Sequence, residues 1–175
     1  MNQSYFRHRG DGTENLINAI NYIYLIEKKA VIDKVPTPIK VLKIEYGKIK
    51  DGYFEKDSTV DYYGSVDGIP FCFDSKETAQ KSFPLKNLHQ RQVDYMTNFK
   101  EIGKGYSFIV CHSTSDDVYY FITIEKILEY WKGYIDKTGR KSIPFSELTN
   151  YIIPIRDGLP DYLKSLKKYI GGKLW

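Results

Sequence analysis

The sequence has few of the residues and segments that mark several protein classes. Its two cysteines, Cys72 and Cys111, each lie in an apolar run, and neither belongs to a CxxC motif or a cysteine–histidine cluster. This argues against a disulfide scaffold and a zinc site, and we expect two buried, reduced thiols. No apolar segment reaches the length of a membrane span, and residues 1–12 lack the apolar core of a signal peptide. We therefore expect a cytoplasmic protein without a membrane partner.

A strong excess of one charge is also absent. The chain has 26 Lys and Arg against 22 Asp and Glu, a net charge of +4, and 42% hydrophobic residues. These values are ordinary for a soluble globular protein, and the mild basicity permits a polyanionic partner without requiring one. Tyrosine, in contrast, is abundant, with 16 of 175 residues. We expect most tyrosines in the core and in strands, with a binding surface as the alternative.

The spacing of apolar residues predicts a mixed α/β protein. Helices are expected at residues 13–29, 87–102, 124–134 and 159–169, and strands at 30–35, 39–46, 59–66, 69–75, 106–111 and 118–122. Asp67-Gly68, between two of these strands, favours a tight hairpin turn. We predict one domain over residues 1–175, with a mixed central β-sheet flanked by helices. Within it, residues 1–12 form a flexible arm, and the polar segment at about 47–56 forms a protruding hairpin or loop.

Two pairs of polar residues point to a particular chemistry. Asp74 and Lys76 are two apart on a predicted strand and therefore face the same side. Thr59 and Asp61 have the same spacing on the strand before it. If the two strands form a hairpin, both carboxylates converge, and carboxylate oxygens suit Mg²⁺. A lysine beside them supplies positive charge to a phosphate, which completes the parts needed to hydrolyse a phosphodiester. The alternative is an exposed ion pair without a function, which is common on solvated strands.

Six segments, in order along nearly the whole chain, carry a family resemblance. They are RG with a later glutamate (Arg9, Gly10, Glu14), KVPTPIKVLKIEY (34–46), STVDYYG (58–64), FDSKET (73–78), SFPLKNLHQRQVDYM (82–96) and GRKSIP (139–144). In these segments the chain resembles the RecU Holliday junction resolvases, also called the penicillin-binding-protein-related factor A family. These are restriction-endonuclease-like nucleases with the PD-(D/E)xK motif. FPLKN followed by a helix with His89 and Gln92 is much more specific than Asp-x-Lys alone.

The resemblance implies a fold, an activity and a cofactor. The fold is a restriction-endonuclease-like nuclease core with a protruding stalk hairpin. The activity is that of an Mg²⁺-dependent endonuclease that resolves four-way DNA junctions by paired symmetric nicks. Mn²⁺ is expected to substitute for Mg²⁺, and no small-molecule cofactor is expected. Two symmetric nicks need two sites related by a two-fold axis, so a homodimer is also expected.

The resemblance also implies roles for individual residues. The metal-binding positions of the family fall on Thr59, Asp61, Asp74 and Gln92. Lys76 falls at the position of the transition-state-stabilising lysine, and Glu14 at an acidic position of the first helix that approaches the same metal site. DNA contacts are expected at Arg9, Lys34, Lys48, Lys50, Tyr53, Phe54, Lys86 and His89. For the two aromatic residues of the stalk, a wedge against unstacked bases and a contact between protomers both stay open.

Some positions depart from the family pattern. Asp74 stands where the family has Glu, and its shorter side chain changes the distance to a metal. The long basic N-terminal extension of some members is nearly absent. Two other functions stay open at this point. One is a restriction-like or repair nuclease that cuts ordinary duplex DNA, and the other is a non-catalytic protein that binds junctions.

Overall fold

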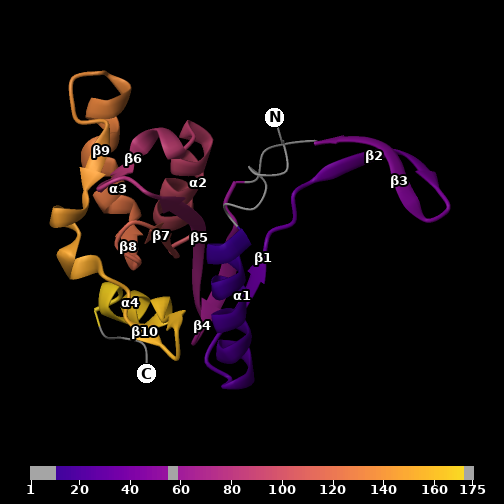
Figure 1. Cartoon of the computed structure of the whole chain (residues 1–175), viewed down its shortest axis with the longest axis horizontal. Coiled ribbons are helices and arrows are strands. Elements are labelled where there is room, and N and C mark those ends of the chain that lie inside the picture. The colour runs from indigo at the N-terminus through magenta and orange to yellow at the C-terminus, as the bar shows by residue number, and fades with distance from the viewer. Residues whose placement is uncertain (1–10, 55–58, 172–175) are drawn as a thin grey trace.

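A computed structural model describes residues 11–54 and 59–171, which fold around a mixed five-stranded sheet with helices on both faces (Figure 1). The helices are α1 (Asp11–Ile26), α2 (Gln90–Glu101), α3 (Ile124–Ile135) and α4 (Tyr162–Tyr169). The strands are β1 (Val31–Lys34), β2 (Ile39–Glu45), β3 (Lys48–Phe54), β4 (Tyr62–Val66), β5 (Ile69–Thr78), β6 (Ser82–Pro84), β7 (Tyr106–Ser113), β8 (Val118–Thr123), β9 (Ser142–Pro144), β10 (Ile155–Arg156) and β11 (Leu159–Pro160). The predicted mixed α/β class is confirmed.

The central sheet has the strand order β1-β4-β5-β7-β8. Only the β5–β7 pair in it is parallel, and this pair aligns Asp74 with Ile109 and Lys76 with Cys111. The predicted turn between β4 and β5 is confirmed: Asp67 and Gly68 have φ of 50° and 78°. Positive φ at both central residues is the geometry that joins two strands tightly. The long strand β5 thus lies at the centre of the sheet.

Side chains alternate along β5, so each face of the strand serves a different hydrophobic core. Phe71 and Phe73 pack with α1 and α4, while Cys72 packs with α2 and α3. Aromatic rings fill the first core, where the Phe73 ring stacks on that of Phe108 with centroids 5.1 Å apart. Many tyrosines are part of these cores, as expected, and Tyr62 is fully buried. The two cysteines are buried and reduced, as expected.

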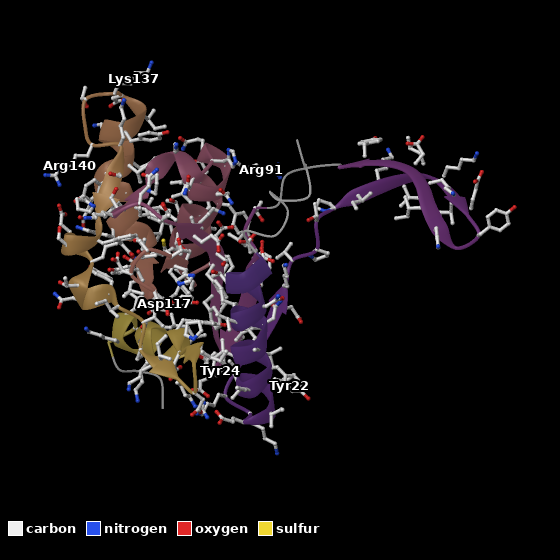
Figure 2. All side chains as sticks on the ribbon, in the orientation of Figure 1. Tyr22, Tyr24, Arg91, Asp117, Lys137 and Arg140 are labelled. Carbon is white, nitrogen blue, oxygen red and sulfur yellow. The ribbon has the colours of Figure 1, made fainter. Side chains whose placement is uncertain are left out.

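The first helix is fixed against the C-terminal part of the chain. Tyr24 points from α1 towards α4, and its hydroxyl donates a hydrogen bond to Asp161 Oδ1 over 2.7 Å (Figure 2). Burial, together with this carboxylate, raises the pKa of Tyr24 well above its usual value. Tyr22 on the same helix points away from the body and is 65% exposed (Figure 2). The α1 surface that carries Tyr22 is therefore not covered by the rest of the described chain.

The protruding segment is longer than predicted. β2 pairs with β3 in an antiparallel hairpin, which projects from the body of the molecule (Figure 1). Its tip is Tyr46-Gly47, with φ of 50° and 72°. The predicted stalk at about 47–56 therefore covers only the second strand, and its last two residues lie outside the described part. The strand predicted at 39–46 is confirmed as β2, but it belongs to the hairpin, and its apolar side chains are exposed.

Three other predicted boundaries were wrong. α1 begins at Asp11, so the end of the predicted arm is helical, and the rest of the arm lies outside the described residues. β4 begins at Tyr62, so Thr59 and Asp61 precede the strand instead of lying in it. The strand predicted at 69–75 is longer than expected, because β5 continues to pair with β7 up to Thr78. β6 and the short 3₁₀ helix η1 (Leu85–Asn87) follow.

No helix within residues 11–54 and 59–171 is both long enough and apolar enough to cross a bilayer.

Candidate active site

Asp74 and Lys76 lie side by side on the face of β5 that is turned towards α2 and α3. Lys76 Nζ forms an ion pair with Asp74 Oδ2, which confirms that the two side chains face the same side. Asp74 is fully buried, and the Lys76 side chain is 22% exposed. Among the described residues, Asp74 Oδ2 has the Lys76 ammonium as its ion-pair partner but no hydrogen-bond partner. A buried carboxylate oxygen with spare acceptor capacity is uncommon and indicates a functional position.

Asp61 reaches the same point from another segment of the chain. Its carboxylate Oδ2 accepts a hydrogen bond of 2.8 Å from the backbone N–H of Ser75, the residue between Asp74 and Lys76. Its own carbonyl accepts a hydrogen bond of 2.8 Å from Val35 N, which holds the backbone just before β4 begins. The convergence of the two carboxylates is confirmed. Asp61 does not lie in a strand that pairs with β5 at this point. The hydrogen bond from Ser75 of β5 holds its carboxylate beside Asp74.

The charges of this site perturb one another. Burial raises the pKa of Asp74, Lys76 lowers it and the nearby Asp61 carboxylate raises it, and together these effects bring the pKa to about 7. Burial by itself lowers the pKa of Lys76, but Asp74 and Asp61 more than offset this, so its pKa lies above the usual value. Lys76 therefore stays charged, and one ammonium has to balance two carboxylates. The site accordingly favours an additional positive charge, either a proton or a cation.

Gln92 fixes the orientation of the Asp74 carboxylate. Its amide Nε2 donates a hydrogen bond of 3.1 Å to Asp74 Oδ1, and its Oε1 accepts one of 3.1 Å from His89 N. His89 is the N-cap of α2, and its side chain accepts a hydrogen bond from a backbone N–H of the first turn, which completes a capping box. The amide therefore turns its nitrogen, and not its oxygen, towards Asp74. The metal contact expected of Gln92 stays a prediction.

Two further residues, Thr59 and Glu14, were expected at this centre. Thr59 Oγ1 lies 3.0 Å from the hydroxyl of Tyr63, within hydrogen-bond distance. Glu14, on the first turns of α1, forms an ion pair with Lys34 at the end of β1. The Glu14 charge also contributes to the raised pKa of Lys76, so α1 brings this carboxylate into the electrostatic neighbourhood of the centre. Lys34 thus has a carboxylate partner before any DNA is bound.

The residues expected to contact DNA are not brought together in one place. Lys48, Lys50 and Tyr53 lie on the projecting hairpin. Lys86 lies on η1, close in sequence to His89. Arg9 lies outside the described residues, and the side chain of Phe54 is not described. The expected DNA contacts therefore divide between the hairpin and the body of the molecule.

A polar network behind the centre had not been predicted. Glu77 follows Lys76 and points to the opposite face of the sheet, where its Oε2 accepts a hydrogen bond of 3.1 Å from Thr13 Oγ1. The same hydroxyl lies 3.0 Å from His112 Nδ1, and His112 Nε2 lies 3.0 Å from Asp117 Oδ1. This network attaches the first turn of α1 to β5 and β7, next to Glu14. The strand alternation around FDSKET shows that Glu77 faces away from Lys76, but it does not identify its partners.

The donor set fits a divalent cation that keeps much of its own hydration. Among the described residues, no group of three or more His, Cys, Asp or Glu side chains is placed to hold a metal. Mg²⁺ in proteins is commonly held by one or two carboxylates, with water and substrate phosphate supplying the other oxygens. Asp61 and Asp74 supply two carboxylates, and Asp74 Oδ2 has unused acceptor capacity. These residues would hold the cation.

The central strand β5 carries the buried Asp74 and the paired Lys76, and the Asp61 carboxylate approaches them from the segment before β4. Endonucleases hydrolyse phosphodiesters with carboxylates and a lysine arranged in this general way. Residues 8–169 match the family described as RecU, Recombination protein U. The chain belongs to this family.

Related proteins from two bacteria support the assignment. A protein of Limosilactobacillus fermentum named "Holliday junction resolvase RecU" is 38% identical over 176 residues, which cover 95% of this chain and 82% of that protein. A protein of the same name from Streptococcus sanguinis is 38% identical, with coverages of 95% and 86%. A solved structure of Archaeoglobus fulgidus Hjc, described as a Holliday junction resolvase, aligns with a TM-score of 0.41 and 9% identity over 67% of this chain and 74% of that chain. That similarity is too low to add to the assignment.

Proposed function

We propose that this protein is a divalent-metal-dependent endonuclease that resolves four-way DNA junctions by paired symmetric nicks. The metal is Mg²⁺, with Mn²⁺ as a substitute. The protein acts in the cytoplasm as a homodimer, because two symmetric nicks need two centres related by a two-fold axis. The single observation that carries the proposal is the Asp61–Asp74–Lys76 centre, in a chain whose relatives are named Holliday junction resolvases.

Each residue of the centre has a defined task in this proposal. Asp61 and Asp74 bind the cation through their carboxylates, and Gln92 keeps Asp74 in the required orientation. When bound, the cation polarises the phosphate and favours ionisation of a water molecule. Thr59 adds a hydroxyl oxygen near the same point. Glu14 contributes negative charge from α1 and keeps Lys34 in place until DNA arrives.

Lys76 stabilises the charge that develops during hydrolysis. Its ammonium is fixed by the ion pair with Asp74, and its pKa lies above the usual value, so it stays protonated at neutral pH. Attack of water on a phosphodiester adds negative charge to the non-bridging oxygens of the phosphorus. A preorganised cation in a site with little water stabilises that charge more strongly than it stabilises the ground state. Lys76 thus contributes to the rate and not to metal binding.

The β2–β3 hairpin selects branched DNA. Lys48 and Lys50 of the hairpin attract the phosphates that crowd at the centre of a junction. Tyr53 is 49% exposed and offers a ring that stacks on unpaired bases or contacts the second protomer. Recognition by shape needs few contacts with base edges, so we expect little dependence on the DNA sequence for binding.

The experiment is a cleavage assay with a labelled mobile four-way junction and a linear duplex of matching sequence, each with Mg²⁺ and with EDTA. Metal-dependent paired nicks in the junction, with little cutting of the duplex, support the proposal. Equal cutting of both substrates would identify a nuclease for ordinary duplex DNA. Binding of the junction without cleavage at any Mg²⁺ or Mn²⁺ concentration would identify a non-catalytic junction-binding protein.

A further inference from the structure

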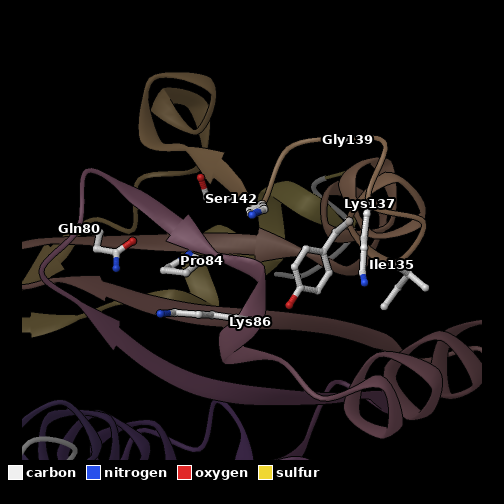
Figure 3. A pocket seen from close by; sticks show the side chains of 9 residues that line it. Gln80, Pro84, Lys86, Ile135, Lys137, Gly139 and Ser142 are labelled. Carbon is white, nitrogen blue, oxygen red and sulfur yellow. The ribbon is translucent and has the colours of Figure 1, made fainter.

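A lysine-rich pocket lies beside the candidate active site, and none of the residues assigned to catalysis or metal binding lines it. It has a volume of about 740 Å³ and is formed by the segment after β5, by η1 and by the loop between α3 and β9 (Figure 3). We call it the lysine pocket. The residues used in the argument below are Gln80, Lys86, Tyr134, Lys137, Lys141 and Ser142.

The charge of the lysine pocket is entirely positive. Three of its nine lining residues are lysines, and none of the nine is acidic. Lys86, Lys137 and Lys141 are exposed, and no ion pair joins them to a carboxylate in the described part of the chain. The neighbouring Arg140, in contrast, pairs with Glu147 over 2.8 Å. Three unpaired ammonium groups around one hollow attract an anion.

The pocket wall is built by a close contact between two glycines. Gly139 approaches Gly133 so closely that a Cβ at Gly139 would lie 2.9 Å from Gly133 Cα. The amides of Thr138 and Gly139 donate hydrogen bonds of 2.9 Å and 2.8 Å to Gly133 O. The C-terminal end of a helix has partial negative charge, which opposes an anion nearby. Here the two amides of Thr138 and Gly139 cap the last turn of α3. The loop that contains them turns Lys137 towards the pocket (Figure 3).

Two segments of the pocket wall are joined directly, along the chain, to segments of the candidate active site. Gln80 is four residues after Lys76, so their Cα atoms are at most about 14 Å apart. Lys86 is three residues before His89, whose backbone N–H holds Gln92. Core residues of β6 and β9 pack on the face of the sheet to which Asp74 and Lys76 point. In B-form DNA each strand advances about 3.4 Å per base pair, so the wall of the pocket at Gln80 lies within about four base pairs of Lys76.

We propose that the lysine pocket binds a backbone phosphate of a junction arm, within about four base pairs of the phosphodiester that is cut. This rests on the proposed function. Lys137 and Lys141 neutralise the phosphate, and the hydroxyls of Tyr134 and Ser142 and the amide of Gln80 are hydrogen-bond donors beside it. The contact fixes the direction in which the arm leaves the active site. A free polyphosphate shares the same chemistry, and the experiment separates the two sources.

The first measurement compares two pairs of substitutions with the same change in net charge. Lys137→Gln with Lys141→Gln removes the pocket charges, and Lys28→Gln with Lys132→Gln removes two exposed lysines outside it. Junction affinity is measured over a range of salt concentrations. The pocket variant should bind roughly tenfold more weakly at low salt, and its salt dependence should be shallower by about 1 in slope. The control variant should match the parent protein. Equal behaviour of the two variants overturns the inference.

The second measurement uses the unaltered protein, and therefore does not depend on the folding of a variant. Single backbone phosphates of the arms are replaced, one at a time, by neutral methylphosphonates. A replacement within about four base pairs of the cut should weaken binding by the parent and by the control, but not by the pocket variant. If every neutral replacement affects the parent and the pocket variant equally, no arm phosphate lies in the pocket and the inference is wrong.

A third measurement tests a free ligand. Binding of inorganic pyrophosphate and ATP is measured by calorimetry. Binding that is lost in the pocket variant, with unchanged junction affinity, would make the pocket a site for free phosphates and overturn the proposed arm contact. The parent protein separates the two proposals. If the parent does not cut junctions, the proposed function fails. If it cuts them and the pocket variant behaves like the control, only the inference fails.

Discussion

The candidate active site and the β2–β3 hairpin are built in opposite ways. Asp74 lies on the central strand of the sheet and is fully buried, with a charge partner on one side and an amide donor on the other. In the hairpin, nearly every described side chain is exposed, including apolar ones such as Ile44, which is 64% exposed. Ile44 pairs across the hairpin with Ile49, which is 55% exposed. A two-stranded hairpin with no covered face is at best marginally stable by itself.

Under the proposed function, this difference separates chemistry from recognition. The geometry at Asp74 is determined by packing within one protomer, so it is in place before DNA binds. The hairpin has no apolar partner in the described chain, so its apolar side chains are available to a second protomer or to the bases of a junction. A change in the hairpin should therefore alter which DNA is bound, while a change at the buried site should alter only the rate. The four predictions below test this separation.

The largest effect is expected from Asp74→Asn. The substitution removes the carboxylate that would hold the cation, so junction cleavage should be abolished. Binding should stay near normal or become tighter, because one negative charge is lost close to the DNA. The Asn oxygen can still accept the hydrogen bond from Gln92, which preserves the local packing. Asp67→Asn, in the exposed β4–β5 turn, is the matched control and should cut normally. Resolution by Asp74→Asn near the parental rate would exclude Asp74 as a ligand.

The next effect is expected from Lys76→Ala. Loss of one preorganised electrostatic donor should lower the cleavage rate by at least ~10²-fold. Metal affinity should not fall, because an ammonium group is not a ligand and its removal leaves more negative charge at the site. Single-turnover rates over a range of Mg²⁺ concentrations test both statements, with Lys104→Ala as the control on the surface. A defect that high Mg²⁺ repairs would contradict the role given to Lys76.

The hairpin itself gives the third effect. Replacing residues 39–56 with a short glycine-containing linker removes the whole stalk. Replacing only 47–56 would leave β2 without its partner strand. Junction affinity should fall towards that of linear duplex, because the element that recognises shape is gone while the basic body remains. Gel-shift titrations of junction and duplex at fixed salt measure the preference, and sizing of the variant should still show a dimer. An unchanged preference in a dimeric variant would place junction recognition elsewhere.

The sequence predicts best what local rules determine. The Asp67-Gly68 turn follows from the preference of its residues for positive φ, and the shared side of Asp74 and Lys76 follows from strand alternation. The predicted stalk was too short because the alternation of apolar residues at 39–46 is the same in an exposed hairpin as in a core strand. Only the tertiary fold shows that, in the described part of the chain, the apolar side chains of that strand stay exposed.

The sequence alone did not predict contacts between residues that are far apart in the chain. The predicted hairpin, and then the family resemblance, put Asp61 at the centre, but neither predicted the hydrogen bond from Ser75 N that holds it, which joins residues 14 apart. The direction of the Gln92 amide depends on the helix cap at His89. Lys137 and Lys141 belong to a loop that lies beside residues more than 50 positions earlier in the chain. No rule of residue spacing predicts that these two segments are neighbours.

The smallest effect is a pH dependence of stability that belongs to the buried site alone. Because Asp74 has a pKa of about 7 in the folded protein, well above the usual value for the unfolded chain, the folded state holds its proton more tightly. This contribution to stability is therefore complete below the ordinary carboxyl pKa and is lost as the pH rises to about 7. In EDTA, the melting temperature of the parent should fall between pH 5 and pH 8, relative to the melting temperature of the Asp74→Asn variant.

Added Mg²⁺ should reverse this trend, because the cation replaces the proton. A ligand that binds only the folded state stabilises it according to its affinity, and the affinity rises as Asp74 loses its proton. Mg²⁺ should thus raise the melting temperature of the parent more at pH 8 than at pH 6, and should do little for Asp74→Asn. The hairpin variant should behave as the parent does, because its deletion leaves the buried site intact. If deletion of the hairpin removed the Mg²⁺ effect, recognition and chemistry would be coupled, and the separation argued above would be wrong.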